Sequence, residues 1–178
     1  LMLTRSLTSV HRICQVLGEA SDLEEPDQPV TQVPDGSVDL ERVSFQYQAG
    51  AEKYALRDVE LHIRAGETVG IVGGTGSAKS TLVQLIPRLY DATQGTVRVG
   101  GRDVREYDLP ALRNAVGIVL QKNVLFSGTI RDNLRWGNPD ADDQMIWAAC
   151  QGACADEFVE QMAEGLDPDL GQGGVNLS

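Results

Sequence analysis

The chain has 178 residues, of which 42% are hydrophobic, and this is enough for one globular domain with a sizeable core. Its formal net charge of −11 and its pI near 4.5 argue against general binding to nucleic acids or to anionic membranes, because both need a basic surface. Any strongly anionic ligand would therefore need a local site. The three cysteines have neither zinc-site nor C-x-x-C spacing, so we expect reduced thiols, as in a cytosolic protein.

The first segment is expected to be an amphipathic helix that Gly18 could close. Its apolar residues lie three or four positions apart: Leu3, Leu7, Val10, Cys14 and Leu17. This helix either packs on the domain's own surface or forms the tail of a preceding segment, and the sequence favours neither. Residues 21–34 hold acidic side chains and three prolines, which is typical of a linker.

Two stretches with alternating hydrophobicity then predict β-strands. In residues 38–47 the alternation slips by one position at Glu41-Arg42, which indicates a β-bulge. Residues 59–63 form the second strand, and the turn at 64–66 leads onward. Tyr47 ends the first strand, where an exposed aromatic ring could stack on a base. An ordinary half-buried strand tyrosine fits the spacing equally well.

A glycine-rich loop lies between an apolar strand and an apolar helix. Residues 68–72 are small or β-branched, which suits a strand buried on both faces of a parallel sheet. After the loop, a helical pattern of leucines and isoleucine begins near Lys79 and is stopped or kinked by Pro87. The order strand, loop, helix is the context that a G-x-x-x-x-G-K-[ST] phosphate loop needs, because backbone N–H groups then converge on one point.

The loop residues predict specific roles. Glycines let the backbone curl around a β-phosphate, Lys79 can reach the β- and γ-phosphates, and the Ser80 hydroxyl can bind Mg²⁺. Ala78 replaces the second fixed glycine of the pattern; its β-carbon is harmless if φ is negative and costly if φ is positive. The alternative is a glycine-rich turn with an incidental lysine. The candidate phosphate-binding residues are Gly73, Gly74, Thr75, Gly76, Ser77, Ala78, Lys79, Ser80 and Thr81.

Further along, residues 95–104 predict a tight hairpin around Gly100-Gly101, and Asp108 is expected to cap a short helix. Residues 116–120 predict a second buried strand that delivers Gln121 to its carboxyl end, where ligands bind in α/β sheets. Gln121 could coordinate Mg²⁺ or orient a water molecule. From the residues alone, an ordinary polar loop residue is the better interpretation.

The last third of the chain is expected to be helical. Thr129 and Asp132 have the spacing of a capping box, and a helix with Asp142 and Asp143 in its first turn follows. The chain then ends in a glycine-rich stretch, residues 171–178.

Together these residues resemble the nucleotide-binding domain of an ABC transporter of the exporter (multidrug or lipid) type. The resemblance covers nearly the whole chain and is most specific at residues 73–81 (the Walker A loop), 120–130 and 174–178. It implies that Gln121 belongs to the family's Q-loop and contacts Mg²⁺ and the attacking water. It also implies that Tyr47 stacks on adenine, and that the terminal Leu177-Ser178 begins an LSGGQ signature.

The resemblance implies an α/β fold: a P-loop NTPase core with an N-terminal antiparallel β region and a helical subdomain, incomplete at the C-terminus. Residues 1–20 would lead from a preceding transmembrane domain, 21–36 would be a linker, 37–122 the ATP-binding core and 123–178 the helical subdomain. The implied cofactors are ATP and Mg²⁺. The implied partners are a transmembrane domain and a second nucleotide-binding domain, at the cytoplasmic face of a cell membrane.

Other catalytic parts of the family would lie beyond Ser178: an acidic strand for Mg²⁺, a glutamate that polarises water, and a histidine. We therefore expect the chain to bind Mg-ATP weakly and to turn over little of it, with Lys79 and Gln121 as its catalytic residues. Gln172 stands where the family usually has a glutamate. Two other classes remain open: a different P-loop enzyme such as a GTPase or kinase, and a non-catalytic nucleotide-binding module.

Overall fold

The computed structural model describes residues 2–18, 21–48, 50–162 and 164–171, with side chains from residue 9 onward. The chain divides into two compact units, residues 1–117 and 118–178. The expected division into a leading helix, linker, core and helical subdomain stays a prediction.

The predicted first helix is confirmed as α1, Met2–Leu17. Its last turn closes through a hydrogen bond from Gly18 N to Cys14 O of 2.9 Å. Every described side chain of this helix, from residue 9 onward, is exposed, and Leu17 is 80% exposed. The described part of the apolar stripe, Val10, Cys14 and Leu17, is therefore open to solvent.

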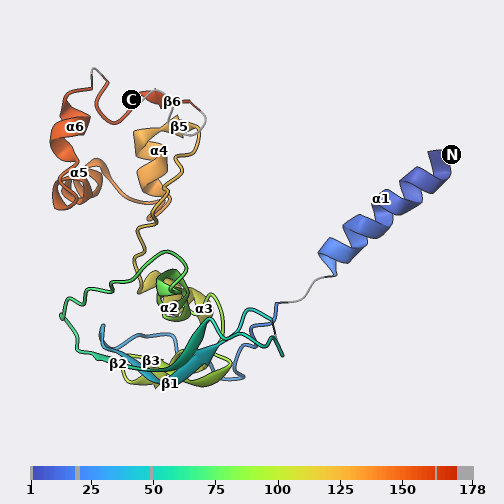
Figure 1. Cartoon of the computed structure of the whole chain (residues 1–178). Coiled ribbons are helices and arrows are strands. Elements are labelled where there is room, and N and C mark those ends of the chain that lie inside the picture. Colours follow the sequence, from blue (N-terminus) through green and yellow to red (C-terminus); the bar gives the residue numbers. More distant parts are fainter. Residues whose placement is uncertain (1, 19–20, 49, 163, 172–178) are drawn as a thin grey trace. The chain divides into compact units, whose positions relative to one another are not determined.

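The first unit is organised around an antiparallel sheet whose middle is β1 (Figure 1). Its strands, in the spatial order β2-β1-β3-β4, are β2 Leu56–Ile63, β1 Val38–Phe45, β3 Gln94–Val99 and β4 Arg102–Asp103. The β1–β2 register shifts between Leu40 and Val43, and Arg42 has a φ of 47°, so the bulge predicted at Glu41-Arg42 is confirmed. The hairpin at Gly100-Gly101 is confirmed as the β3–β4 turn, with both glycines at positive φ.

Two short helices lie on one face of this sheet (Figure 1). They are α2, Lys79–Leu85, and α3, Leu109–Asn114; a 3-10 turn, Val104–Glu106, precedes α3. Leu85 and Leu112 are fully buried against strand residues such as Leu40. Asp108 caps α3 as predicted, accepting a hydrogen bond of 2.9 Å from Ala111 N.

The segment between α1 and β1 forms hydrogen bonds with later parts of the first unit. Arg88, which follows α2 and is 1% exposed, pairs with both carboxylate oxygens of Asp91 at 2.7 and 3.0 Å. Its Nη2 also donates to Glu24 O at 2.7 Å. Further along, Val30 N donates to Glu106 O at 2.8 Å. The stretch expected to be a linker is therefore attached to the domain at two points.

Two strand predictions are wrong. Residues 68–72 and 116–120 are irregular, and their apolar side chains are largely open to solvent, with Val72 97% and Val119 89% exposed. An apolar run of β-branched residues indicates a buried parallel strand only when neighbouring strands can pair with it. The described residues provide neither segment with a hydrogen-bonded strand neighbour.

The second unit contains three helices and a short two-stranded sheet among its described residues. These are β5 Gly128–Thr129, α4 Ile130–Arg135, α5 Asp143–Gly152, α6 Asp156–Glu160 and β6 Asp169–Leu170. The predicted capping box is confirmed: Asp132 N donates to Thr129 Oγ1 at 3.0 Å, and Thr129 N donates to Asp132 Oδ2 at 2.9 Å. Hydrogen bonds from the backbone and the side chain of Thr129 to the Asp132 carboxyl lower its pKa. Burial of Cys150 in this unit's core raises the pKa of its thiol.

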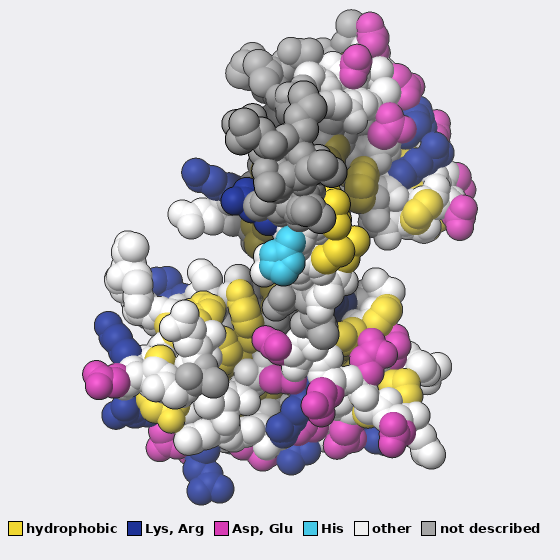
Figure 2. Space-filling model, turned by 90° about the vertical axis from the view of Figure 1, so that its right-hand side faces the viewer, with side chains coloured by type: hydrophobic (Ala, Val, Ile, Leu, Met, Phe, Trp, Pro, Cys, Tyr) yellow, Lys and Arg dark blue, Asp and Glu magenta, His cyan; other side chains and the backbone are white. Residues whose placement is uncertain are grey.

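The surface carries charges of both signs. On the face shown in Figure 2, acidic side chains lie among lysines and arginines. None of the helices that the structure describes is both long and apolar enough to cross a membrane.

Gly95 tests the packing of the bulge. It has a φ of 81°, and a β-carbon there would overlap the carbonyl oxygens of Glu41 and Arg42. Gly66 is the matched control, because its φ of 79° is similar but no atom lies within 4 Å of its β-carbon position. We expect Gly66→Ala to lower the free energy of unfolding by about 1 kcal/mol, and Gly95→Ala to lower it by about 2 kcal/mol more. Urea denaturation measures both, and equal losses would contradict the packing described here.

Candidate functional site

The glycine-rich loop forms a tight turn immediately before α2. Ser77 N donates to Gly74 O at 3.3 Å, and Ser77 Oγ donates to the same oxygen at 2.8 Å. Gly76 has a φ of 81°, which a glycine adopts without strain. A β-carbon on Gly73 would lie 2.6 Å from Ser77 Oγ, so a larger residue there would displace the Ser77 hydroxyl from its bond to Gly74 O.

Lys79, the first residue of α2, reaches back over the loop. Its ammonium donates to Gly73 O at 2.7 Å, to Gly74 O at 2.8 Å and to Ser77 Oγ at 3.2 Å. The positive charge is therefore held at the loop by neutral oxygens. A phosphate oxygen that displaced one of these carbonyls would form a charge-assisted bond, which is the stronger kind.

A hollow of about 540 Å³ opens beside the loop, within the usual range for small-molecule sites. Six of its ten lining residues come from the loop and α2, and four come from the connection between β1 and β2. The lining residues are Tyr47, Lys53, Tyr54, Ala55, Gly76, Ser77, Ala78, Lys79, Ser80 and Thr81. Two of them are cations and none is acidic, although the chain has 26 acidic residues against 15 basic ones.

Tyr47 lies against α2 two residues after β1 ends. Its hydroxyl shares a hydrogen bond of 2.7 Å with Thr81 Oγ1. Its ring meets Phe45 and Tyr90 edge-on, with centroids 4.9 and 5.5 Å away. The side chain is nevertheless 59% exposed, so part of the ring is open to the hollow that it lines. The fold thus brings the predicted base-stacking residue to the same hollow as the loop.

The other predicted residues are placed as follows. Ser80 is exposed at the hollow, so its hydroxyl could bind a cation there. Gly73, Gly74 and Thr75 belong to the loop but not to the lining of the hollow. Gln121 is exposed in an irregular segment of the second unit, and its role stays a prediction.

The loop is suited to bind Mg²⁺ together with the phosphates of a nucleotide. No group of three or more His, Cys, Asp or Glu side chains that could hold a metal occurs in the part of the chain that the structure describes. Mg²⁺ normally keeps several waters and takes further ligands from substrate phosphates, so one hydroxyl such as that of Ser80 is a fitting protein contribution.

The sequence analysis missed Lys53, Tyr54 and Ala55. They belong to no motif, and they line the hollow because β1 and β2 pair as antiparallel strands, which returns their connection to the level of Tyr47. The one available signal was their closeness in sequence to Tyr47.

Comparisons with known proteins identify relatives of this chain. The family model "ABC transporter" matches residues 56–171, more than half of the chain. A multidrug efflux ATP-binding/permease protein of Mycobacterium tuberculosis is 42% identical over 167 residues, covering 94% of this chain and 14% of that protein. A putative multidrug export ATP-binding/permease protein of Bacillus subtilis is 43% identical over 177 residues, covering 99% of this chain and 30% of that protein.

Among solved structures, a bacterial Atm1-family ABC exporter with ATP bound matches with a TM-score of 0.88 and 30% identity. The match covers 98% of this chain and 30% of that one. The chain therefore spans less than a third of each of these relatives. The likeness confirms the expected fold class, a mixed α/β P-loop ATPase fold with an antiparallel β region.

Ala78 gives a test of the loop. Its φ of 60° is left-handed, so the β-carbon that replaces the pattern's glycine is on the costly side. Ala78 is the N-cap of α2, so this strain is a property of the folded loop. We expect Ala78→Gly to raise the free energy of unfolding by about 1 kcal/mol.

Urea denaturation measures this gain. The affinity for Mg-ATP should change less than about twofold, because the substitution removes the backbone strain from the free chain and from the bound chain alike. A large gain in affinity without a gain in stability would contradict the account.

Proposed function

Because this chain belongs to the ABC transporter family, we propose that it is the ATP-binding part of an exporter that couples ATP binding and hydrolysis to the export of a substrate across a membrane. The observation that carries the proposal is the loop at residues 73–81, folded around Lys79 beside a hollow of suitable size. The named relatives support the exporter type, since they are multidrug efflux or export ATP-binding/permease proteins.

In the proposed complex, the loop encloses the β- and γ-phosphates. Lys79 exchanges the carbonyl oxygens of Gly73 and Gly74 for phosphate oxygens, and backbone N–H groups of the loop complete the shell. The Ser80 hydroxyl would hold Mg²⁺, which would supply positive charge beside the phosphates. The exposed part of the Tyr47 ring stacks on the base.

Hydrolysis requires a water in line with the γ-phosphate. We assign its orientation, and a further contact with Mg²⁺, to Gln121, with Lys79 stabilising the transferred phosphoryl group. The expected start of the signature, Leu177-Ser178, and Gln172 lie outside the described residues. The chain by itself should bind Mg-ATP but turn over little of it.

The proposed partners are a transmembrane domain, carried on the same chain or on another, and a second nucleotide-binding domain. The matched relatives have an ATP-binding part and a permease part in their names, and this chain spans only part of their length. Such an assembly places the ATP-binding domain at the cytoplasmic face of a cell membrane.

One alternative keeps some support. The left-handed Ala78 is a departure from the phosphate-loop pattern, and it favours a nucleotide-binding module that lacks catalysis. The family match favours ATP as the nucleotide, and a GTPase has no comparable observation in its favour.

Equilibrium binding of Mg-ATP to the chain tests the proposal. Lys79→Met removes charge-assisted bonds and should weaken binding by about ten- to a hundredfold. Tyr47→Ala removes a stacking surface and should weaken it about tenfold, whereas Tyr47→Phe keeps the ring and should stay within about threefold of the parent. GTP should compete poorly with ATP.

Unfolding midpoints of the variants serve as the folding control. A parent chain that binds no ATP, or a Lys79→Met variant that binds as well as the parent, would refute the proposal.

Turnover separates the proposal from the non-catalytic alternative. In the full-length protein, we expect Lys79→Ala to lower ATP hydrolysis and transport by at least about a hundredfold, since the transferred phosphoryl group loses a stabilising cation. Phosphate release and substrate export measure the two activities. Undiminished export in that variant would favour the non-catalytic module.

A further inference from the structure

A second cation, Lys53, lines the hollow from a segment other than the phosphate loop. Lys53 belongs to the connection between β1 and β2, whereas Lys79 belongs to α2. Both line one hollow that contains no acidic side chain, in a chain whose net charge is −11. The hollow is therefore locally positive although the chain as a whole is negative, and Lys53 is not part of the phosphate loop.

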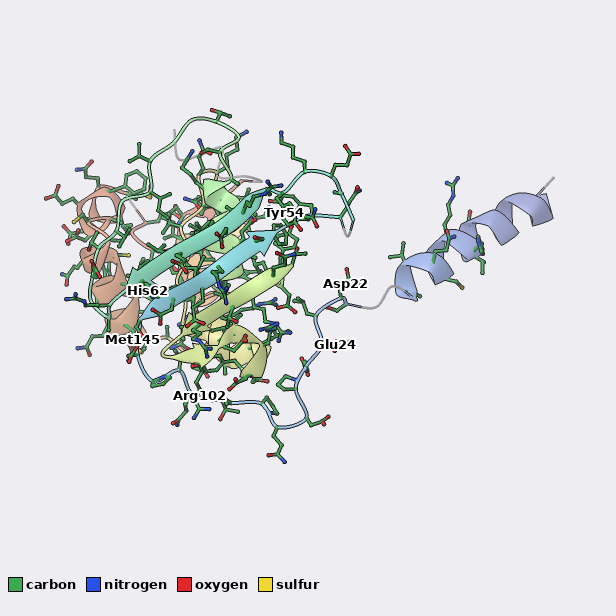
Figure 3. All side chains as sticks on the ribbon, turned by 60° about the horizontal axis from the view of Figure 1, so that its bottom comes forward. Asp22, Glu24, Tyr54, His62, Arg102 and Met145 are labelled. Atoms are coloured by element: carbon green, nitrogen blue, oxygen red, sulfur yellow. The ribbon has the colours of Figure 1, made fainter. Side chains whose placement is uncertain are left out.

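The neighbouring backbone and ring hold Lys53 at this place. Ala55 N donates to Phe45 O at 2.8 Å, which closes the connection at its base. Tyr54 is fixed from two sides, since the Arg57 guanidinium carbon lies 5.1 Å from its ring centroid and Gln94 Nε2 donates to its hydroxyl at 3.4 Å. Figure 3 shows Tyr54 at one end of β2 and His62 at the other. The two residues that follow Lys53 are therefore anchored to the sheet.

The ammonium of Lys53 differs from that of Lys79 in its partners. Lys79 donates to three oxygens of the loop. Lys53 is exposed, and its ammonium has no hydrogen bond or ion pair with any residue that the structure describes. It can thus meet an anion without losing an existing contact, and only its water shell has to be displaced.

We propose that Lys53 is a second phosphate-binding residue, which contacts the phosphate chain of the nucleotide from the wall formed by the β1–β2 connection. The inference rests on the proposed function, because it needs a nucleotide in this hollow. A triphosphate carries more negative charge than Lys79 and one Mg²⁺ neutralise, and a lysine at the rim can reduce the remainder. The contact should favour nucleotides with longer phosphate chains.

The test compares Lys53→Ala with Arg64→Ala in the whole chain. Both variants remove one positive charge, but Arg64 follows the far end of β2 and does not line the hollow. At low ionic strength, Lys53→Ala should weaken Mg-ATP binding about fivefold, the upper end for an exposed charge pair. Lys53→Arg should bind like the parent, and Arg64→Ala should stay within about 1.5-fold of it.

Two further measurements separate phosphate contact from other causes. The affinity for adenosine, which has no phosphate, should not change in Lys53→Ala, and the loss for ATP should shrink as salt is added. Unchanged ATP affinity in Lys53→Ala, an equal loss for adenosine, or an equal loss in Arg64→Ala would each overturn the inference while leaving the proposed function intact. A parent chain that binds no ATP would overturn both.

Discussion

The structure of the candidate site depends on one interaction, the contact between the Lys79 ammonium and the carbonyl oxygens of Gly73 and Gly74. This contact folds the loop back on the start of α2 and keeps a positive charge at the edge of the hollow without an acidic partner. A carboxylate in that place would compete with phosphate for the lysine. Neutral carbonyls hold the charge more weakly, so an anion with several oxygens can replace them. These contacts leave Lys79 able to exchange carbonyl oxygens for phosphate oxygens.

The antiparallel sheet brings the remaining side chains of the candidate site, Tyr47 and Lys53, to the hollow. Because β1 lies between β2 and β3, its end carries Tyr47 to α2, and the hydrogen bond to Thr81 ties the two together. The same strand pairing returns the β1–β2 connection to the hollow and brings Lys53 with it. After α2, the buried Arg88 binds Asp91 and the carbonyl of Glu24, so the helix that begins at the loop is joined to the segment that follows α1. One wall, the loop and the preceding segment therefore belong to a single unit of the fold.

Features set by neighbouring residues could be predicted from the sequence. The capping box at Thr129 and the Asp108 cap each depend on side chains and backbone within a few positions, and the structure has both. The bulge at Glu41-Arg42 was visible as a slip in the alternation of apolar residues along its own strand. The strands expected at residues 68–72 and 116–120 failed because a parallel strand also requires partners from elsewhere in the chain. Lys53 could not be found, since only the strand pairing places it. The cost of Ala78 depended on the sign of φ, which the residue type does not determine.

Hydrogen–deuterium exchange of the whole chain with and without Mg-ATP tests the central claim most directly, because it locates the nucleotide on the backbone. The account predicts slower amide exchange at residues 73–81 and in the β1–β2 connection when Mg-ATP is present, and no such slowing in Lys79→Met. Unchanged exchange in that loop at saturating Mg-ATP, or protection confined to other segments, would contradict it.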